Sequence, residues 1–288
     1  MRADGKRYIQ YPSRSTTIKL WNLSDLHLGN RGCAKDLLQE KIREIRDDPC
    51  SFWVGGGDYA DYISYTDRRF DPACISDDLA IADLGQLGLA LTTRVRDMFK
   101  PIAHKGLGLL FGNHEVKYMR EHNQQNLHAW LCTELSLPNL GYSALFDLVF
   151  IRKHDQAEIS LCAKPEYGSP YQMTSVRVFV HHGASAAQSH GGRINRLAKF
   201  MTDWIADIYM IGHTHDAKGL KIEPLGGNDE CSKVVAFPRI GTITGGFLRA
   251  YDQSEYPGYG EVRAYTPTPL GAACVEIKPD TREMFARI

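Results

Sequence analysis

Five short apolar runs, each ending in Gly, Asp, Asn or His, most constrain what this chain can fold into. They are IKLWNLSD (18–25), SFWVGGGD (51–58), GLLFGNH (108–114), VRVFVHH (176–182) and DIYMIGHTH (207–215). Near-continuous apolar runs of this length, rich in β-branched and aromatic residues, predict buried strands. Helical patterns separate most of them, with one apolar face along 34–47, another along 77–100 and a third along 194–205. Strands that alternate with helices predict a layered α/β protein.

Composition narrows the class of protein further. The 288 residues hold 34 Lys plus Arg against 34 Asp plus Glu, so the broad basic surface of a protein that binds nucleic acid or anionic membranes is not expected. The most apolar run, 140–151, is too short and too polar to span a bilayer, and the N-terminus shows no apolar signal segment. Seven scattered cysteines without a C-x-x-C pair favour reduced thiols. We therefore expect a soluble, cytoplasmic protein with no membrane partner.

The chain shows no repeat, low-complexity tract or linker that would divide it. We expect a single domain over 1–288, with its core motifs in 18–216 and a glycine-rich, β-like part in 217–288 that completes a second sheet. Residues 59–76 predict a surface loop near the second polar cluster. The mildly basic first twenty residues predict a solvated tail.

A polar cluster follows each apolar run directly. In order, the clusters are Asp25-x-His27, Asp58-x-x-Asp61, Asn113-His114-Glu115, His181-His182 and His213-x-His215. Ligands of α/β sheets bind at the carboxyl ends of the strands, so we expect these side chains to meet. A spacing of two at a strand end places both side chains on one side of the backbone, which lets Asp25 and His27 share an ion. Carboxylate, imidazole and amide groups suit divalent ions such as Zn, Mn, Fe or Ni.

Taken in order, the five segments resemble the metallophosphoesterase (calcineurin-like phosphoesterase) superfamily. Its pattern D-x-H, G-D-x-x-D, G-N-H-[DE], H, G-H-x-H is matched at each position, over roughly 18–216. The resemblance implies a four-layer α/β/β/α sandwich, with two mixed sheets flanked by helices. It also implies two bound divalent ions, with Mn foremost and Fe, Zn, Ni or Co as alternatives.

The resemblance further implies a role for each motif residue. Asp58 bridges the two ions, of which one is held by Asp25, His27 and His215 and the other by Asn113, His181 and His213. A bridging water, made acidic by the two ions, attacks phosphorus in line. His114 donates to a phosphoryl oxygen or to the leaving group, and Asp61 orients His114.

The fourth motif leaves the choice between two histidines open. His181 is favoured as the ligand because it ends the apolar strand directly, and His182 then contacts the substrate or satisfies a backbone group. Arg193, at the start of a predicted helix, is a candidate contact for a phosphate. A solvated arginine fits that position equally well.

Departures from the family pattern narrow the expected substrate. Tyr62-Ile63 follows Asp61 where phosphoprotein phosphatases carry Arg-Gly, and Asp61 itself stands where purple acid phosphatases carry tyrosine. SDLHLG (24–29) resembles the opening of the repair-exonuclease branch, but no DNA-capping region or coiled-coil pattern is found. We expect hydrolysis of phosphodiester bonds in a nucleotide or nucleic-acid type substrate. The alternatives are a phosphomonoesterase acting on small molecules and a non-catalytic scaffold of the same fold.

Overall fold

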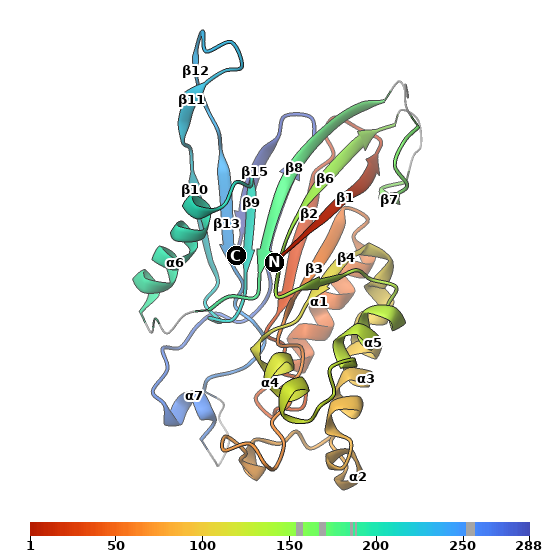
Figure 1. The fold of residues 1–288 in the computed structure, drawn as a ribbon, viewed down its shortest axis with the longest axis vertical. Coiled ribbons are helices and arrows are strands. Elements are labelled where there is room, and N and C mark those ends of the chain that lie inside the picture. The colour runs from red at the N-terminus through yellow and green to blue at the C-terminus, as the bar shows by residue number, and fades with distance from the viewer. Residues whose placement is uncertain (154–157, 167–170, 185–186, 188, 252–256) are drawn as a thin grey trace.

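The computed structural model describes residues 1–153, 158–166, 171–184, 187, 189–251 and 257–288. Two mixed β-sheets dominate it (Figure 1). The first has the order β10 (Lys218–Ile222), β13 (Arg239–Ile243), β9 (Ile208–Ile211), β8 (Gln172–His181), β6 (Ser143–Arg152), β1 (Arg2–Tyr11) and β7 (Ser160–Cys162). The second has the order β15 (Glu283–Arg287), β14 (Ala273–Lys278), β2 (Ile18–Ser24), β3 (Ser51–Gly57), β4 (Gly106–Leu110) and β5 (Asn139–Gly141).

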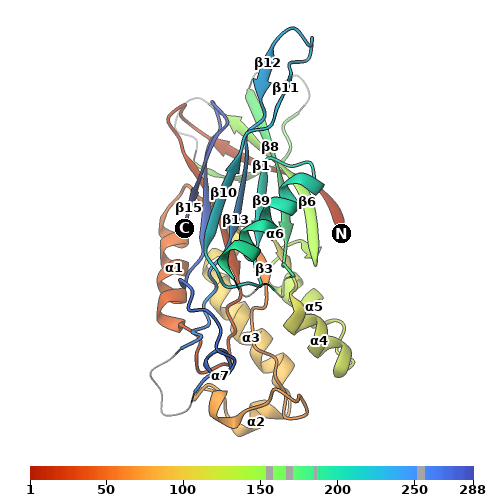
Figure 2. The ribbon, with the colours of Figure 1, turned by 90° about the vertical axis from the view of Figure 1, so that its left-hand side faces the viewer.

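Helices flank these sheets, some on the outer faces and others at the lower end of the molecule (Figures 1 and 2). They are α1 (Lys35–Asp47), α2 (Ile81–Leu84), α3 (Leu87–Phe99), α4 (Asn113–Glu121), α5 (Leu127–Glu134), α6 (His190–Asp203) and α7 (Tyr259–Val262), with 3₁₀ turns at Pro72–Cys74 and Lys100–Lys105. A hairpin of β11 (Leu225–Gly227) and β12 (Val234–Ala236) projects beyond the sheets at the top of Figure 1. Among the described residues, none of the helices combines the length and apolar character needed to cross a membrane.

Three buried clusters hold the layers together. One fills the space between the two sheets, where side chains such as Phe52 of β3 and Val178 of β8 are fully shielded from solvent. A second packs α1, α3 and α5 against the six-stranded sheet, and a third packs α6 against the seven-stranded sheet. The order helix, sheet, sheet, helix confirms the predicted four-layer α/β/β/α sandwich.

The expectation of a solvated N-terminal tail is wrong. Residues Arg2–Tyr11 form β1, which lies parallel to β6 inside the seven-stranded sheet. Ile9 and Tyr11 are completely buried, and the Tyr11 hydroxyl donates a hydrogen bond to Asp280 at 2.6 Å. The basic residues Lys6 and Arg7 explain the error, because they interrupt the apolar run that marks a buried strand. Arg7 lies on the same face as Ile9 and Tyr11, where its Nε donates to the Leu107 carbonyl at 3.2 Å.

The strands of the C-terminal part 217–288, which we expected to complete the second sheet, contribute to both sheets. β10 and β13 extend the seven-stranded sheet, whereas β14 and β15 extend the six-stranded sheet beside β2. The predicted surface loop 59–76 is anchored by aromatic groups, since Tyr59 and Tyr62 belong to the buried cluster under α3. The Tyr62 hydroxyl lies 2.9 Å from the hydroxyl of Thr92 on that helix.

Candidate metal centre

The site forms where parallel strands of both sheets end. β2, β3 and β4 are parallel neighbours in one sheet, and β8 and β9 are parallel neighbours in the other. The segments after β2 and β3 continue side by side as loops: the Asp25 amide donates to the Gly57 carbonyl at 2.9 Å and the Leu28 amide to the Tyr59 carbonyl at 3.0 Å. All five polar clusters therefore reach one edge of the sandwich, as the sequence predicts for the carboxyl ends of strands.

Left-handed backbone conformations turn several candidate ligand side chains toward one another. Positive φ angles occur at five of them: Asp25, His27, Asp58, His213 and His215. Non-glycine residues rarely adopt this region, and such residues gather at functional sites. The expected strand pleat does not bring Asp25 and His27 together, because β2 ends at Ser24. Their convergence comes from left-handed turns on either side of Leu26.

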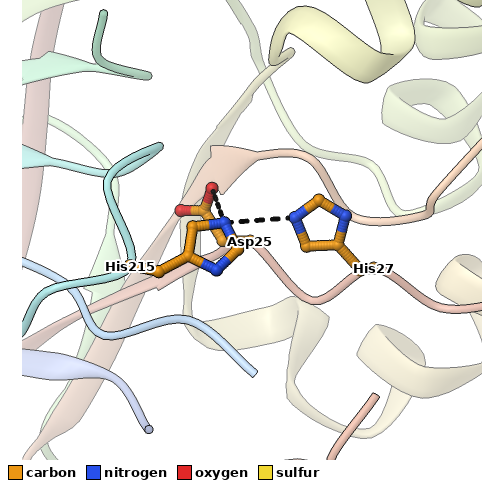
Figure 3. Close-up of side chains that lie close together, drawn as sticks. All are labelled: Asp25, His27 and His215. Carbon is orange, nitrogen blue, oxygen red and sulfur yellow. Dashed lines mark hydrogen bonds and ion pairs between the residues drawn. The ribbon is translucent and has the colours of Figure 1, made fainter. Parts of the chain in front are cut away.

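The first group of potential ligand atoms comes from Asp25, His27 and His215 (Figure 3). Nε2 of His215 lies 3.3 Å from Oδ1 of Asp25 and 3.3 Å from Nε2 of His27. The three side chains thus point at one small volume from two different loops. Asp25 is completely buried and His27 is 3% exposed, whereas the side chain of His215 is 23% exposed, so this volume opens to solvent on the side of His215.

Asp25 is held in its charged form. Both of its carboxylate oxygens accept from the backbone amide of His213, at 2.8 and 3.0 Å, and the Ser24 hydroxyl donates at 2.6 Å. Burial alone would raise the pKa of Asp25, but the neighbouring imidazole of His215 and its hydrogen bond lower the pKa below its ordinary value. An ionised carboxylate is the form that binds a cation.

His27 is oriented by Asp61. Oδ1 of Asp61 lies 3.1 Å from Nδ1 of His27, and the other carboxylate oxygen accepts from the side-chain amide of Asn30 at 3.0 Å. Nδ1 of His27 therefore carries the proton and its Nε2 is left with a lone pair facing His215. Burial lowers the pKa of His27, which also favours the neutral, metal-binding form.

The second group consists of Asp58, His182 and His213. Nε2 of His182 lies 3.2 Å from Oδ2 of Asp58 and 3.0 Å from Oδ1 of Asn113. Nδ1 of His182 donates to the Gly56 carbonyl at 2.8 Å, which turns the opposite ring nitrogen toward the site. Burial acts to lower the pKa of His182, but the charge of Asp58 and the hydrogen bond to it outweigh this and raise the pKa to about 10.

His181 lies outside this group. Its ring packs against Phe200 of α6, with centroids 4.9 Å apart, and its Nδ1 accepts from the Gly183 amide at 2.8 Å. Successive side chains of a strand point to opposite faces, so His181 faces helix α6 and His182 faces the site. The structure therefore brings His182, and not the expected His181, to the candidate ligand atoms. A substrate contact by His182 stays a prediction.

His114 lies between the two groups. Its backbone amide donates to Oδ1 of Asp58 at 2.9 Å, and its ring forms a third candidate group with Asp58 and His27. Nδ1 of His114 donates to the backbone carbonyl of Asp61, whereas the nearest Asp61 carboxylate oxygen is 3.6 Å away. Asp61 therefore holds His114 through its main chain and His27 through its side chain.

Glu115 is a buried residue of the site that the sequence reasoning did not assign. Its carboxylate accepts from the backbone amides of Asp58, Tyr59 and Gly112, at 2.8–2.9 Å. It thereby ties the turn after β3 to the start of α4. Burial and the charge of Asp58 raise the pKa of Glu115 to about 7. The acidic position in the first turn of α4, next to the Asn-His pair, is the sequence signal for this role.

Two glycines make the close approach possible. A Cβ on Gly112 would lie 2.1 Å from Oδ1 of Asp58, and a Cβ on Gly246, where φ is +71°, would lie 2.9 Å from Cβ of Asp25. Both contacts are shorter than real side chains tolerate. Any larger residue at these positions would push a candidate ligand out of place.

Arg193 sits behind the ligand loop. Nη1 of Arg193 lies 3.2 Å from Asp216, a completely buried carboxylate that also accepts from His190 at 2.7 Å. Since Asp216 follows His215 directly, this pair ties helix α6 to the segment that carries His213 and His215. A phosphate contact by Arg193 stays a prediction.

The donor set fits a divalent cation. Carboxylates, imidazoles and an amide oxygen converge, and within each of the three groups the ligand atoms lie within 4.8 Å of one another. Asp58 belongs to two of these groups. The Nε2 atoms of His27 and His215 face each other at 3.3 Å. Because the proton of His27 is on Nδ1, its Nε2 has a free electron pair that can bind an ion.

Known proteins resemble the chain in fold only at a distance. No family model and no curated protein sequence matches it. A predicted phosphoesterase from Streptococcus pneumoniae aligns over 94% of this chain and 99% of its own at 11% identity, with a TM-score of 0.35. Vps29 from Entamoeba histolytica, solved with Zn²⁺, aligns over 94% and 97% at 9% identity and 0.35. A metallophosphoesterase from Sphaerobacter thermophilus aligns over 94% of this chain and 88% of its own at 14% identity, with a TM-score of 0.36.

Proposed function

We propose that this chain is a metallophosphoesterase that hydrolyses phosphodiester bonds of a nucleotide or nucleic-acid type substrate with the help of two divalent metal ions. The observation that carries the proposal is that Asp58 belongs both to the group with His182 and His213 and to the group with His27 and His114, while His27 also belongs to the group with Asp25 and His215. A carboxylate placed between two sets of potential ligands is suited to a centre of two ions.

The proposed ligands divide between the two groups. Asp25, His27 and His215 would hold one ion and Asn113, His182 and His213 would hold the other. Asp58, which forms one group with His182 and His213 and another with His27 and His114, would contribute its carboxylate between them. When bound, two such ions supply an activated water and neutralise the charge of the phosphoryl group. Manganese is the first choice, with Fe, Zn, Ni or Co as alternatives, since the ligand types suit all of them.

The protein supplies orientation around this centre. Asp61 fixes the tautomer of His27 through its carboxylate, and its main-chain carbonyl fixes the ring of His114. His114 then has Nε2 directed away from Asp61, where it can donate to a phosphoryl oxygen or to the leaving group. Glu115 fixes the position of the Asp58 backbone relative to the start of α4 by accepting from the amides of Asp58 and Gly112.

Hydrolysis of bis-p-nitrophenyl phosphate and p-nitrophenyl phosphate, after reconstitution with manganese or nickel in turn, tests the proposal. Faster turnover of the diester is the expected result. Faster turnover of the monoester would replace the proposal with a small-molecule phosphomonoesterase, and no turnover with two bound ions would favour a non-catalytic scaffold. Asp58→Asn and His213→Ala should each lower kcat by several orders of magnitude, with circular dichroism confirming an unchanged fold.

His114→Ala separates the acid from the ligands. The variant should keep its full metal content and should lose about 10²–10⁴-fold in kcat, most strongly on substrates with poor leaving groups. Metal content measured by elemental analysis decides the assignment. A loss of metal from His114→Ala would make His114 a ligand rather than a donor to the substrate.

A further inference from the structure

We propose that Asn30 is a positioning residue, which holds the carboxylate of Asp61 against His27 and thereby sets how tightly the first group of potential ligand atoms binds an ion. The inference rests on the function proposed above only in that it treats this group as an ion site. Asn30 follows His27 closely in the chain but belongs to none of the five polar clusters predicted from the sequence.

The carboxylate of Asp61 lies between two imidazole rings. Its Oδ1 is 3.1 Å from Nδ1 of His27 and 3.6 Å from Nδ1 of His114. The two rings meet edge to face, with their centroids 4.8 Å apart. The terminal torsion of an aspartate side chain has a broad range, so a carboxylate with only one oxygen held can rotate. A second contact is therefore needed to decide which of the two imidazoles the carboxylate bonds.

Asn30 supplies that contact. Its Nδ2 donates to Oδ2 of Asp61 at 3.0 Å, which leaves Oδ1 for His27. The other end of the same amide accepts from the backbone amide of Gly32 at 2.8 Å. A backbone N–H can only donate, so this end is the oxygen and the end that faces Asp61 is the nitrogen. The main chain thus fixes the direction of the Asn30 side-chain amide.

The main chain also joins the segments that carry these three residues. The Asn30 amide donates to the His27 carbonyl at 3.1 Å, and the Asp61 amide donates to the Leu28 carbonyl at 2.9 Å. The side chains of Asp61 and His27 are 13% and 4% exposed, so the hydrogen bond between them is stronger than it would be in water. This ring of contacts holds one arrangement of the Asp61 carboxylate.

The arrangement matters for His27 more than for His114. Nδ1 of His114 donates to the main-chain carbonyl of Asp61, a bond that does not involve the carboxylate. The tautomer of His27 is set by the hydrogen bond that its Nδ1 makes to the carboxylate. If the carboxylate turns away, His27 can take the tautomer with the proton on Nε2. That form cannot bind an ion through the nitrogen that faces His215.

The test replaces Asn30 by serine and compares the variant with a matched asparagine. A serine hydroxyl can still accept from the amide two residues further on, as in the present turn, but it is too short to reach Asp61. Asn139 of strand β5 makes the same turn, since its Oδ1 accepts from the Gly141 amide at 3.0 Å, and it belongs to none of the three ligand groups. The proteins are therefore the unaltered chain, Asn30→Ser and the control Asn139→Ser.

The first readout is the tautomer of His27 in the metal-free proteins. Nuclear magnetic resonance measures the chemical shifts of the ring nitrogens at mildly alkaline pH, and His27→Gln assigns the signals. The unaltered chain and Asn139→Ser should show the proton on Nδ1. Asn30→Ser should show a second form with the proton on Nε2. A spectrum of Asn30→Ser in which the proton stays on Nδ1, as in the control, overturns the inference.

The second readout is the affinity for Mn²⁺, measured calorimetrically in two backgrounds that each keep one ligand group intact. His213→Ala keeps the first group, and His215→Ala keeps the second. Asn30→Ser should weaken binding about tenfold in the first background, the lower end of the usual cost of losing an orienting partner. It should leave binding in the second background unchanged, because the second group does not contain His27. Equal losses in the two backgrounds, or no loss in either, overturn the inference.

Both readouts are independent of turnover. If the unaltered chain hydrolyses neither nitrophenyl ester, that result counts against the proposed function alone, and the two readouts still decide the role of Asn30. If the unaltered chain binds no Mn²⁺, the spectra of the metal-free proteins decide whether Asn30 positions Asp61.

Discussion

Oδ1 of Asp61 lies 3.1 Å from Nδ1 of His27, so one carboxylate fixes which ring nitrogen of His27 faces the site. Asp61→Ala should therefore weaken metal binding about 10–100-fold, the usual cost of removing such an orienting partner. Calorimetric titration with Mn²⁺ measures the change. Ser64→Ala, on the same loop and away from the ligands, serves as the control. An Asp61→Ala protein with unchanged metal affinity would contradict the orienting role.

The two adjacent histidines at the end of β8 should behave in opposite ways. His182→Ala removes a side chain that lies 3.2 Å from Asp58, and we expect it to lose one of the two metal ions and most activity. His181→Ala removes a ring that packs on helix α6, and we expect full metal content with some loss of stability. Elemental analysis of the two purified variants decides between the histidines. Loss of metal from His181→Ala alone would reverse the assignment.

Lys105 should stabilise the fold by donating hydrogen bonds to backbone carbonyls at the C-terminal end of helix α1. Its buried ammonium donates to the carbonyls of Ile45, Arg46 and Asp48, at 2.7–2.8 Å. Lys105→Met leaves these carbonyls without that donor and should lower the free energy of unfolding by about 1–3 kcal/mol. Urea denaturation measures it. The exposed Lys100 provides the matched variant Lys100→Met, which should change the free energy of unfolding little.

His128 should make stability depend on pH. Burial lowers its pKa to about 4, whereas the unfolded chain titrates near the ordinary value of 6.5. Between these values the unfolded chain binds a proton that the folded chain does not. Its stabilising contribution is therefore full above pH 6.5 and is lost as the pH falls toward 4.

The loss between pH 7.5 and pH 5 should amount to about 2 kcal/mol from this group. Urea denaturation of the unaltered protein and of His128→Gln at the two pH values isolates it, because all other titrating groups are shared. The fall in unfolding free energy should be smaller in His128→Gln. An equal fall in both proteins would show that His128 does not titrate in this way.

The strands and the polar groups at their ends could be predicted from the sequence, because buried strands leave long apolar runs. The expected strand at 51–58 is β3 (Ser51–Gly57), and the expected strand at 18–25 is β2 (Ile18–Ser24). β1 could not be found this way, since its basic residues break the apolar run. A strand with many partly exposed positions, such as β1, leaves only a weak apolar pattern.

Details of the site follow from backbone geometry that residue types do not reveal. Neighbouring residues at the end of β8 point to opposite faces of the sheet, so a shift of one residue decides whether His181 or His182 faces the site. The sequence also could not show that the Asp61 carboxylate contacts His27 rather than His114. That choice depends on the path of the loop after β3, which no strand pattern predicts. The loop that carries Arg69 to His114 is anchored by the buried aromatic side chains of Tyr59 and Tyr62.

Five candidate ligands have left-handed backbone conformations, which are unfavourable for folding at the positions where the side chains could bind an ion. An L-residue held in that region costs about 1–2 kcal/mol relative to glycine, which adopts it freely. Glycine at Asp25 or His215 would therefore relieve strain while removing an ion ligand. At these positions the side chains that could bind an ion are thus also the ones that cost the fold stability.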